Sequence, residues 1–181
     1  HRMARGELLG AFSLTEPLHG SDPSGLEVTA RPVRGGFRLD GHKRWATNAT
    51  HAGVTVVWAR LVGGTDPDGA KGPRAIRGFL VDAGTPGFRP MAIHRKLSFR
   101  VSASSEIMFE GCFVPESNAL PGAVGLGSAL KCLNEARFGI VWGVAGAAQA
   151  WRQREGSAPM AELAALMPRP PVQGRPTPCC R

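Results

Sequence analysis

A segment rich in hydroxyls and glycine near the N-terminus is the first candidate for chemistry. It runs from Leu14 to Pro23 and contains Thr15, Gly20, Ser21 and Asp22. Hydroxyls and exposed backbone N–H groups in such a loop can cradle a phosphate or the polar edge of a ring. A simple turn capped by Ser21 and Asp22 has the same composition, and the spacing alone favours this simpler interpretation.

A tryptophan beside two cations is the second candidate. Trp45 follows Lys43 and Arg44 and precedes Thr47 and Asn48. The face of an indole can cover a flat heterocycle, and a threonine hydroxyl can bond the edge of that ring. A tryptophan that only fills the interior of a barrel gives the same pattern, so both interpretations stay open.

A permanent charge on an apolar helical stripe is the third candidate. Arg137 lies four residues after Leu133 and three before Ile140. Charged residues on a packed face are rare unless they are paired. Arg137 therefore either extends to the rim of the packed face or meets an anion from a ligand or another chain.

Other catalytic patterns are missing from the sequence. The five histidines have no carboxylate or cysteine at ligand spacing, and neither a nucleophile elbow nor a Gly-Lys-Ser/Thr phosphate loop is present. Cys112 and Cys132 lack paired metal spacing, and the adjacent Cys179 and Cys180 have poor geometry for a structural disulfide. We expect no metal site, no serine-hydrolase triad and a reducing compartment.

Length and composition bound the class of protein. The 181 residues, 43% hydrophobic and 20% charged, suit one globular domain with or without a trailing segment. The net charge of +8 favours anionic partners, so a basic β-barrel that binds nucleic acid is one alternative. Its cations are dispersed and only 7% of residues are aromatic, which argues against a stacking platform for nucleic acid.

The ends and apolar runs of the sequence give two further expectations. No apolar run approaches the roughly 20 residues that span a bilayer, so we expect no membrane association. The chain starts at His1 without a visible targeting leader, and we expect a truncated product.

The elements that position these residues are mainly strands up to residue 120. Alternation over 26–31, a turn at Gly35-Gly36 and apolar residues over 37–45 predict a hairpin. Residues 54–61 and 76–81 predict two strands buried on both faces, separated by a surface loop at 63–74. With further strands near 88–94 and 106–109, the pattern predicts a barrel or sandwich.

The hydrophobic period becomes helical after a predicted turn at 122–127. One long helix is indicated by apolar residues at helical spacing, namely Leu126, Leu130, Leu133, Ile140, Val144, Ala148 and Trp151. Gly139, Gly143 and Gly146 share another face, where each costs about 1 kcal/mol relative to alanine, and they predict close approach of a neighbouring helix.

The domain organisation follows from these patterns. We expect a β-domain at 1–120, the start of a helical domain at 121–154 and a tail at 155–181. The last 31 residues include six prolines, so the tail is predicted to be disordered or non-native, although residues 161–167 have the pattern of two helical turns.

Six short motifs together are highly specific: Leu14-Thr15-Glu16-Pro17, Gly20-Ser21-Asp22-Pro23, Trp45-Ala46-Thr47-Asn48, Val57-Trp58-Ala59-Arg60, Ile76-Arg77-Gly78-Phe79-Leu80 and Cys132-Leu133-Asn134-Glu135-Ala136-Arg137-Phe138-Gly139-Ile140. With these motifs the sequence resembles the acyl-CoA dehydrogenase family, and most of all its glutaryl-CoA branch. The resemblance spans about residues 4–150. It implies a mainly β fold, the middle β-barrel domain of the family, followed by one long α-helix that begins its C-terminal helical domain.

The resemblance implies FAD-dependent α,β-dehydrogenation of an acyl-CoA thioester. A carboxylate removes the α-proton while the β-hydrogen leaves as hydride to the flavin. In the glutaryl branch, decarboxylation to crotonyl-CoA follows. The implied partners are an electron-transfer flavoprotein and further copies in a homotetramer, in a bacterial cytoplasm or a mitochondrial matrix. Another acyl-CoA dehydrogenase or an acyl-CoA oxidase is the alternative within this class.

The resemblance also implies a role for each matching position. Thr15 would lie at the flavin edge, Trp45 on the ring and Thr47 near its reactive nitrogen, while Ser21 would touch both the flavin and the CoA chain, with Arg137 as the polar anchor of CoA. The implied cofactor-binding residues are Phe12, Leu14, Thr15, Gly20, Ser21, Trp45, Ala46 and Thr47. The implied substrate-binding residues are Ser21, Leu130, Leu133, Asn134 and Arg137.

Two departures from the family accompany these assignments. Ala46 stands where the family commonly has isoleucine, which leaves the flavin edge less tightly packed. The glutamate base, the N-terminal helical domain with the arginine that binds the distal carboxylate of glutaryl-CoA, and the rest of the C-terminal domain have no counterpart here. We therefore expect no catalytic residue in this chain and no dehydrogenation by these residues alone.

Overall fold

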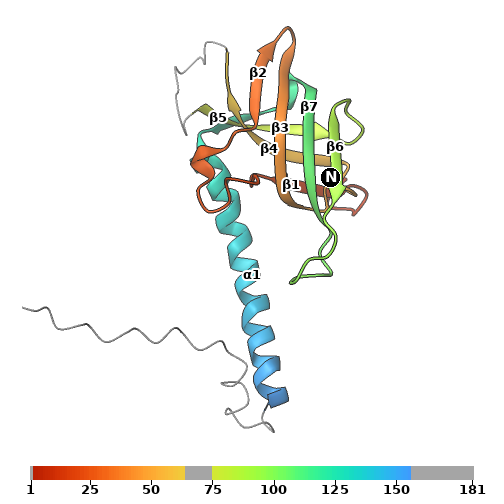
Figure 1. Cartoon of the computed structure of the whole chain (residues 1–181), viewed down its shortest axis with the longest axis vertical. Helices are drawn as coiled ribbons and strands as arrows, with labels where there is room; N and C mark the ends of the chain where they lie inside the picture. Colours follow the sequence, from red (N-terminus) through yellow and green to blue (C-terminus); the bar gives the residue numbers. More distant parts are fainter. Residues whose placement is uncertain (1, 64–74, 156–181) are drawn as a thin grey trace, which may run out of the picture. The chain divides into compact units, whose positions relative to one another are not determined.

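The computed structural model describes residues 2–63 and 75–155 of the chain. Residues 156–181 of the predicted tail and nearly all of the predicted loop at 63–74 lie outside these ranges. The chain divides into two compact units, His1–Asn134 and Glu135–Arg181. The first unit contains the strands and the first turns of the helix, and the second contains the remainder of the helix (Figure 1).

The described residues form one mainly antiparallel sheet followed by a helix, α1 (Leu126–Glu155). The strands are β1 (Gly10–Ser13), β2 (Thr29–Val33), β3 (Gly36–Thr47), β4 (Val54–Leu61), β5 (Ile76–Asp82), β6 (Phe88–Ala92), β7 (Ser104–Pro115) and β8 (Ala119–Val124). Their order in the sheet is β6-β7-β3-β2-β4-β5-β8, and β1 pairs in parallel with β4. The predicted mainly β fold with one long helix is confirmed.

The predicted hairpin is present, because β2 pairs antiparallel with β3 through Val33 and Gly36. The strand predicted at 54–61 is β4, with the same bounds. β6 ends at Ala92, two residues before its predicted end, and β7 extends well beyond the predicted 106–109 on both sides.

β1 ends at Ser13, directly before the loop segment that begins at Leu14. One strand, β8, was not expected from the sequence. The prediction of a turn at 122–127 was wrong over its first residues, because β8 pairs with β5 and continues to Val124. Pro121 and Gly122 suggested the turn, but β8 lies at the end of the sheet order, where a proline removes no needed hydrogen bond.

β4 is buried on both of its faces, as its composition predicted. Val57 and Ala59 face the main core between the strands, and Trp58, only 2% exposed, faces the other way. Trp58 belongs to a second core cluster in which Ala129 is buried and Leu133 packs from the first turns of α1. This cluster attaches the start of the helix to the sheet.

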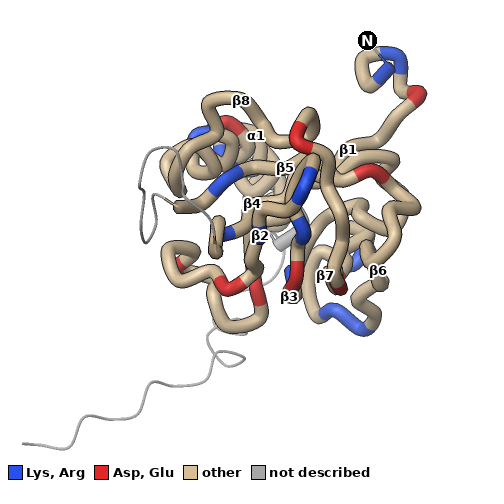
Figure 2. Tube along the Cα trace, turned by 90° about the horizontal axis from the view of Figure 1, so that it is seen from above, with Lys and Arg blue, Asp and Glu red and all other residues tan. Residues whose placement is uncertain are grey.

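Charged residues of both signs are interspersed along the chain (Figure 2). Several form cross-strand ion pairs. Arg89 on β6 lies 3.1 Å from Glu110 on β7, and Arg44 on β3 lies 3.1 Å from Glu106 on β7. Such pairs on a sheet surface each contribute a fraction of a kcal/mol to about 1 kcal/mol.

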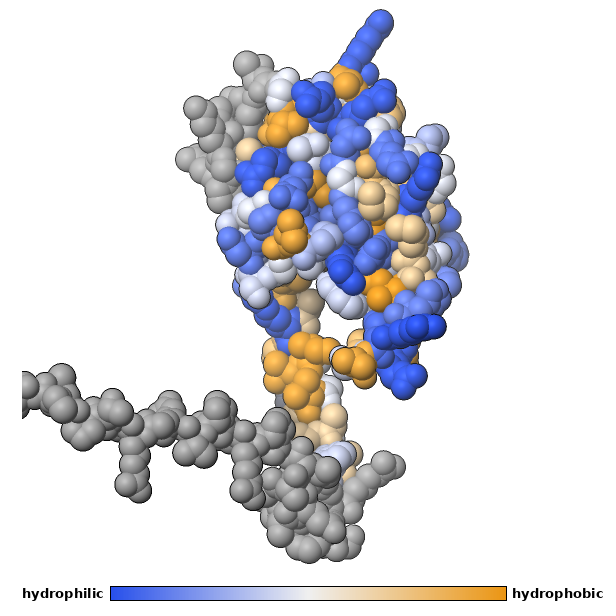
Figure 3. Space-filling model, in the orientation of Figure 1, coloured by the Kyte–Doolittle hydropathy of each residue, from blue (hydrophilic) through white to orange (hydrophobic). Residues whose placement is uncertain are grey.

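The part of α1 in the second unit carries exposed apolar side chains (Figure 3). Phe138 is 71% exposed and Trp142 69% exposed, and their rings meet edge to face at 6.3 Å. Among the described residues, and apart from the adjacent residues and backbone of the helix itself, no atom lies within 4 Å of the position that a Cβ would take at the three glycines predicted to meet a neighbouring helix, Gly139, Gly143 and Gly146.

A glycine at the start of β3 makes the tightest backbone approach in the sheet. A Cβ added at Gly36 would lie 2.1 Å from the Val114 carbonyl oxygen of β7. We therefore predict that Gly36→Ala lowers the free energy of unfolding by about 1–3 kcal/mol, because the strand must shift to relieve the overlap. Urea denaturation with an unchanged m-value measures this loss.

Gly127→Ala is the matched control, because Gly127 lies in α1 with nothing within 4 Å of its added Cβ. This change is expected to be neutral or to stabilise by up to about 1 kcal/mol. A Gly36→Ala variant as stable as the wild type would contradict the register of β3 against β7.

Candidate functional site

A hollow of about 250 Å³ lies in the first unit where β1, the end of β3 and the start of α1 meet. Its walls are apolar with two hydroxyls and one cation, and the lining residues are Phe12, Leu14, Thr15, Arg44, Trp45, Thr47 and Leu133. All but Arg44 were predicted as binding residues from the sequence. Such a mixed apolar wall with a few converging polar groups is typical of a small-molecule site.

A β-bulge brings Trp45 to this hollow. Lys43 pairs with Ile107 of β7, but the next paired residue is Ala46, which faces Ser105. Two residues of β3, Arg44 and Trp45, thus oppose a single residue of β7, which is the count of a bulge.

The bulge requires an unfavourable backbone conformation at Trp45. Trp45 has φ +64°, in the left-handed region that an aromatic residue seldom adopts. As a result the indole is 50% exposed, while Ala46 is 1% exposed and lies in the core. The interpretation of Trp45 as an interior filler is therefore wrong, because Ala46 takes the inward position.

A buried ion pair holds the loop after β1 against β3. Lys43 Nζ lies 2.8 Å from Glu16 Oε1, with side-chain exposures of 0% and 2%. Glu16 also accepts the backbone N–H groups of Glu27 and Val28, the latter at 2.9 Å, and Lys43 also donates to the Leu14 carbonyl oxygen at 2.8 Å. Burial lowers the pKa of Lys43 to about 8, although the neighbouring Glu16 carboxylate acts in the opposite direction.

The same loop is joined to the bulge by a backbone hydrogen bond. The Arg44 N–H donates to the Thr15 carbonyl oxygen at 2.8 Å. Thr15 is thereby fixed beside the bulge of β3 in the wall of the hollow. The arrangement can hold a flat ring against the indole, with the hydroxyls of Thr15 and Thr47 available to its polar edge.

Arg44 is the lining residue that was not among the predicted binding residues, although it is one of the two cations noted before Trp45. Its guanidinium lies 5.0 Å from the centroid of the Trp45 ring, and its Nε lies 3.1 Å from Glu106 Oε1. His42 Nε2 lies 3.3 Å from the other oxygen of Glu106. Arg44 and Glu106 are far apart in the sequence, so only the pairing of β3 with β7 could reveal the contact.

The remaining predicted residues lie elsewhere in the described structure. Gly20 and Ser21 are exposed in the loop after Glu16, where Asp22 rather than Ser21 caps the short 3-10 helix Pro23–Gly25 by accepting the Ser24 N–H at 3.0 Å. None of the other predicted positions lines the hollow: Leu130 is half-buried, Asn134 is exposed, and Arg137 is exposed in the second unit.

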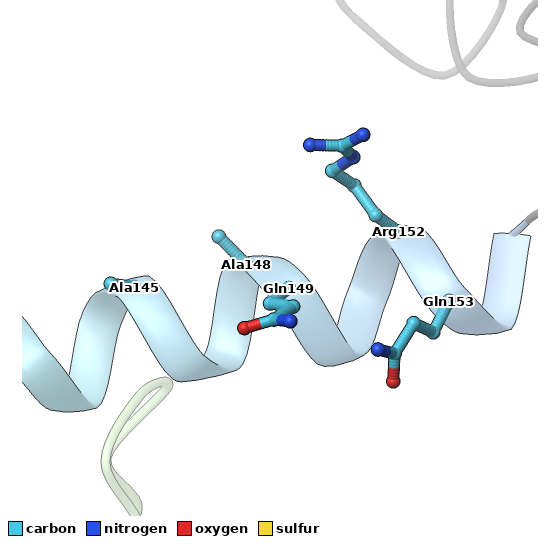
Figure 4. A pocket seen from close by; sticks show the side chains of 5 residues that line it. All are labelled: Ala145, Ala148, Gln149, Arg152 and Gln153. Atoms are coloured by element: carbon cyan, nitrogen blue, oxygen red, sulfur yellow. The ribbon is translucent and has the colours of Figure 1, made fainter.

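Two further hollows differ in the number of chain segments whose described residues line them. One of about 360 Å³ also has Arg44 and Trp45 in its wall and is otherwise lined by residues 93–98. Another, of about 490 Å³, is lined among the described residues by five side chains of α1, Ala145, Ala148, Gln149, Arg152 and Gln153 (Figure 4). Because these five project from one helix alone, they do not enclose a ligand.

Two other classes of site have no candidate in the part of the chain that the structure describes. Residues 2–63 and 75–155 contain no group of three or more histidine, cysteine, aspartate or glutamate residues placed to hold a metal ion. No helix within these ranges is long and apolar enough to cross a membrane.

Comparison with known proteins identifies relatives of this chain. Residues 11–112 match the family described as "Acyl-CoA dehydrogenase, middle domain". The chain is 37% identical over 119 residues to a mitochondrial isovaleryl-CoA dehydrogenase of Oryza sativa, covering 66% of this chain and 28% of the relative. It is 36% identical over 147 residues to a mitochondrial short-chain specific acyl-CoA dehydrogenase of Rattus norvegicus, covering 80% and 34% respectively.

Among solved structures, the chain is similar to a glutaryl-CoA dehydrogenase from Mycobacterium smegmatis in complex with FADH2. The identity is 47% and the TM-score 0.72, with 81% of this chain and 35% of that chain covered. The chain thus spans about a third of the length of the relatives that it matches.

The ion pair beneath the hollow gives a direct test of the site's construction. We predict that Lys43→Met lowers the free energy of unfolding by about 3–5 kcal/mol, because it leaves the buried Glu16 carboxylate without its counter-charge. The double variant Lys43→Met/Glu16→Gln is expected to recover most of the loss, since no bare charge is left. Chemical denaturation of both variants measures the difference.

Arg5→Met serves as the matched control, since it removes a pair with Glu7 whose side chains are 59% and 49% exposed. An exposed pair of this kind is worth less than about 1 kcal/mol. If Lys43→Met and Arg5→Met lost equal stability, the buried pair would not be the contact that holds the loop.

Proposed function

Because the chain belongs to the acyl-CoA dehydrogenase family through that family's middle domain, we propose that it forms the flavin-binding wall of an FAD-dependent acyl-CoA dehydrogenase. The observation that carries this proposal is the hollow itself, which gathers six predicted binding residues from three separate segments. A structural relative at 47% identity was solved with FADH2, which supports the same cofactor.

The residues that line the hollow suit the isoalloxazine ring of FAD. Trp45 offers an exposed indole face, Phe12 and Leu133 offer apolar walls, and the hydroxyls of Thr15 and Thr47 can bond the polar edge of the ring. When bound, the flavin supplies the acceptor for a hydride from the β-carbon of the substrate. The chain's own residues hold the ring and keep water from its covered face.

A carboxylate that removes the α-proton is not present in the wall of the hollow formed by the described residues. Glu16 is the acidic residue next to the lining residues Leu14 and Thr15 in the chain, and its oxygens are already occupied by Lys43 and two backbone N–H groups. We infer that the base belongs to another part of the enzyme, so these residues alone are expected to show no dehydrogenation.

We propose glutaryl-CoA as the substrate, with decarboxylation to crotonyl-CoA. The higher identity to the glutaryl-CoA dehydrogenase, 47% against 37% for the isovaleryl-CoA and 36% for the short-chain relative, favours it. Ser21, Leu130, Leu133, Asn134 and Arg137 would contact the CoA chain. An electron-transfer flavoprotein and a homotetrameric assembly are proposed on the resemblance to the family.

Replacing the indole tests the flavin assignment. We predict that Trp45→Leu weakens FAD binding by about two- to tenfold, the range of an aromatic stacking contact, and relieves the quenching of flavin fluorescence. Phe113→Leu removes another exposed ring, 42% exposed on β7 outside the hollow, and should leave both properties unchanged. Titration of FAD by fluorescence measures both, and equal quenching in wild type and Trp45→Leu would reject the stacking role.

Replacing the helix arginine tests the CoA assignment. Arg137→Ala is expected to weaken binding of a non-reactive acyl-CoA analogue by about 1.5–3 kcal/mol, because a charged hydrogen-bond donor is lost. Arg152→Ala removes an exposed arginine of the same helix and should have little effect in the same calorimetric titration. Equal losses in the two variants would indicate non-specific charge attraction instead of an anchor.

A further inference from the structure

Trp45 separates two hollows of the first unit. The hollow proposed for the flavin and the hollow bordered by residues 93–98 share only Arg44 and Trp45 among their lining residues. The volumes are about 250 Å³ and 360 Å³, so open space adjoins the indole in both. A half-exposed side chain with so little packing needs another contact to keep one orientation.

The contact that the structure provides is the guanidinium of Arg44. It lies 5.0 Å from the centre of the Trp45 ring, within the range of a cation–π interaction. The Arg44 backbone is itself fixed, because its N–H donates to the Thr15 carbonyl oxygen at 2.8 Å. Main chain and side chain of Arg44 thus connect the loop after β1 with the indole.

Glu106 of β7 holds the guanidinium in that place. Glu106 Oε1 lies 3.1 Å from Arg44 Nε, and its Oε2 lies 3.3 Å from His42 Nε2. The Arg44 Nε–H is shielded from water but is not aimed at the carboxylate as a hydrogen bond requires, so the attraction is electrostatic. Glu106 is also the residue of β7 that faces the bulge, between the pairs of Ile107 and Ser105.

From this geometry we propose that Arg44, braced by Glu106, is the positioning residue that fixes the indole of Trp45 between the two hollows. Arg44 does not react; it acts through Trp45. The inference deepens the proposed function, because the orientation of Trp45 would decide how the flavin ring stacks. The orientation itself exists without any flavin, so it can be measured separately.

Fluorine NMR of the whole chain labelled with 5-fluorotryptophan tests the proposal in the absence of flavin. The four tryptophans give four resonances, and Trp45→Phe identifies the one of interest. In Arg44→Met the Trp45 resonance should sharpen and move toward that of free 5-fluorotryptophan. The population of the held indole should fall about two- to fivefold, as expected for loss of an exposed cation–π contact.

Further variants separate positioning from folding. Glu106→Gln should shift the Trp45 resonance in the same direction by less, and Arg44→Lys should restore part of the wild-type position because it keeps a cation. Arg89→Met is the matched control, since it breaks an exposed pair with Glu110 on β7 and should leave the Trp45 resonance in place.

Two outcomes would overturn the proposal. If the Trp45 resonance were unchanged in Arg44→Met, the bulge alone would determine the orientation of the indole. If all four resonances moved in both Arg44→Met and Arg44→Lys, the role of Arg44 would be general stability. A second measurement follows the quenching of flavin fluorescence when FAD is added, which should fall two- to fivefold in Arg44→Met. If the wild type did not bind FAD, the proposed function would be refuted, and the fluorine result would still decide this inference.

Discussion

The buried ion pair between Glu16 and Lys43 is the interaction on which the geometry of the hollow depends. Through their remaining hydrogen bonds, Glu16 also binds Glu27 and Val28, and Lys43 also binds Leu14. Two charges taken out of water are tolerated when each is paired and makes further hydrogen bonds in this way, and removing one partner is far more costly than the pair is stabilising. The pair therefore fixes the position of the loop after β1 relative to β3.

The position of the bulge follows from the same constraint. Side chains alternate along a strand, so regular pairing would place Trp45 on the same inward face as Lys43. Lys43 and Ala46 are both buried, however, at 0% and 1% exposure, and they are three residues apart. One extra residue between them is required, and the bulge turns Arg44 and Trp45 outward beside Thr15, which the ion pair and the Arg44 N–H hold in place.

Local pattern in the sequence predicted the strands that alternate or are rich in β-branched residues, the first hairpin and the long helix. The residues Phe12, Thr15 and Trp45, predicted from the family resemblance to bind the cofactor, line one hollow, and their roles toward a ligand stay predictions. Two kinds of feature could not be predicted from local pattern. One is β8, because Pro121 and Gly122 are typical of a turn. The other is the set of contacts that Glu16 and Arg44 make. The ion pairs of Glu16 with Lys43 and of Arg44 with Glu106 join residues 27 and 62 positions apart, which only the tertiary fold brings near.

The charge in the hollow agrees with a ring that gains electrons. Arg44 is the charged residue in its wall among those the structure describes, and Glu16, the acidic residue that follows Thr15, is paired with Lys43. A cation beside an apolar, partly enclosed space stabilises negative charge that develops there more strongly than it would in open water. Arg44 lies against the indole and leaves the exposed part of that ring free for stacking. Because Glu106 lies 3.1 Å from Arg44 Nε and offsets part of its charge, we infer that Arg44 acts on a bound ring mainly through the orientation of Trp45.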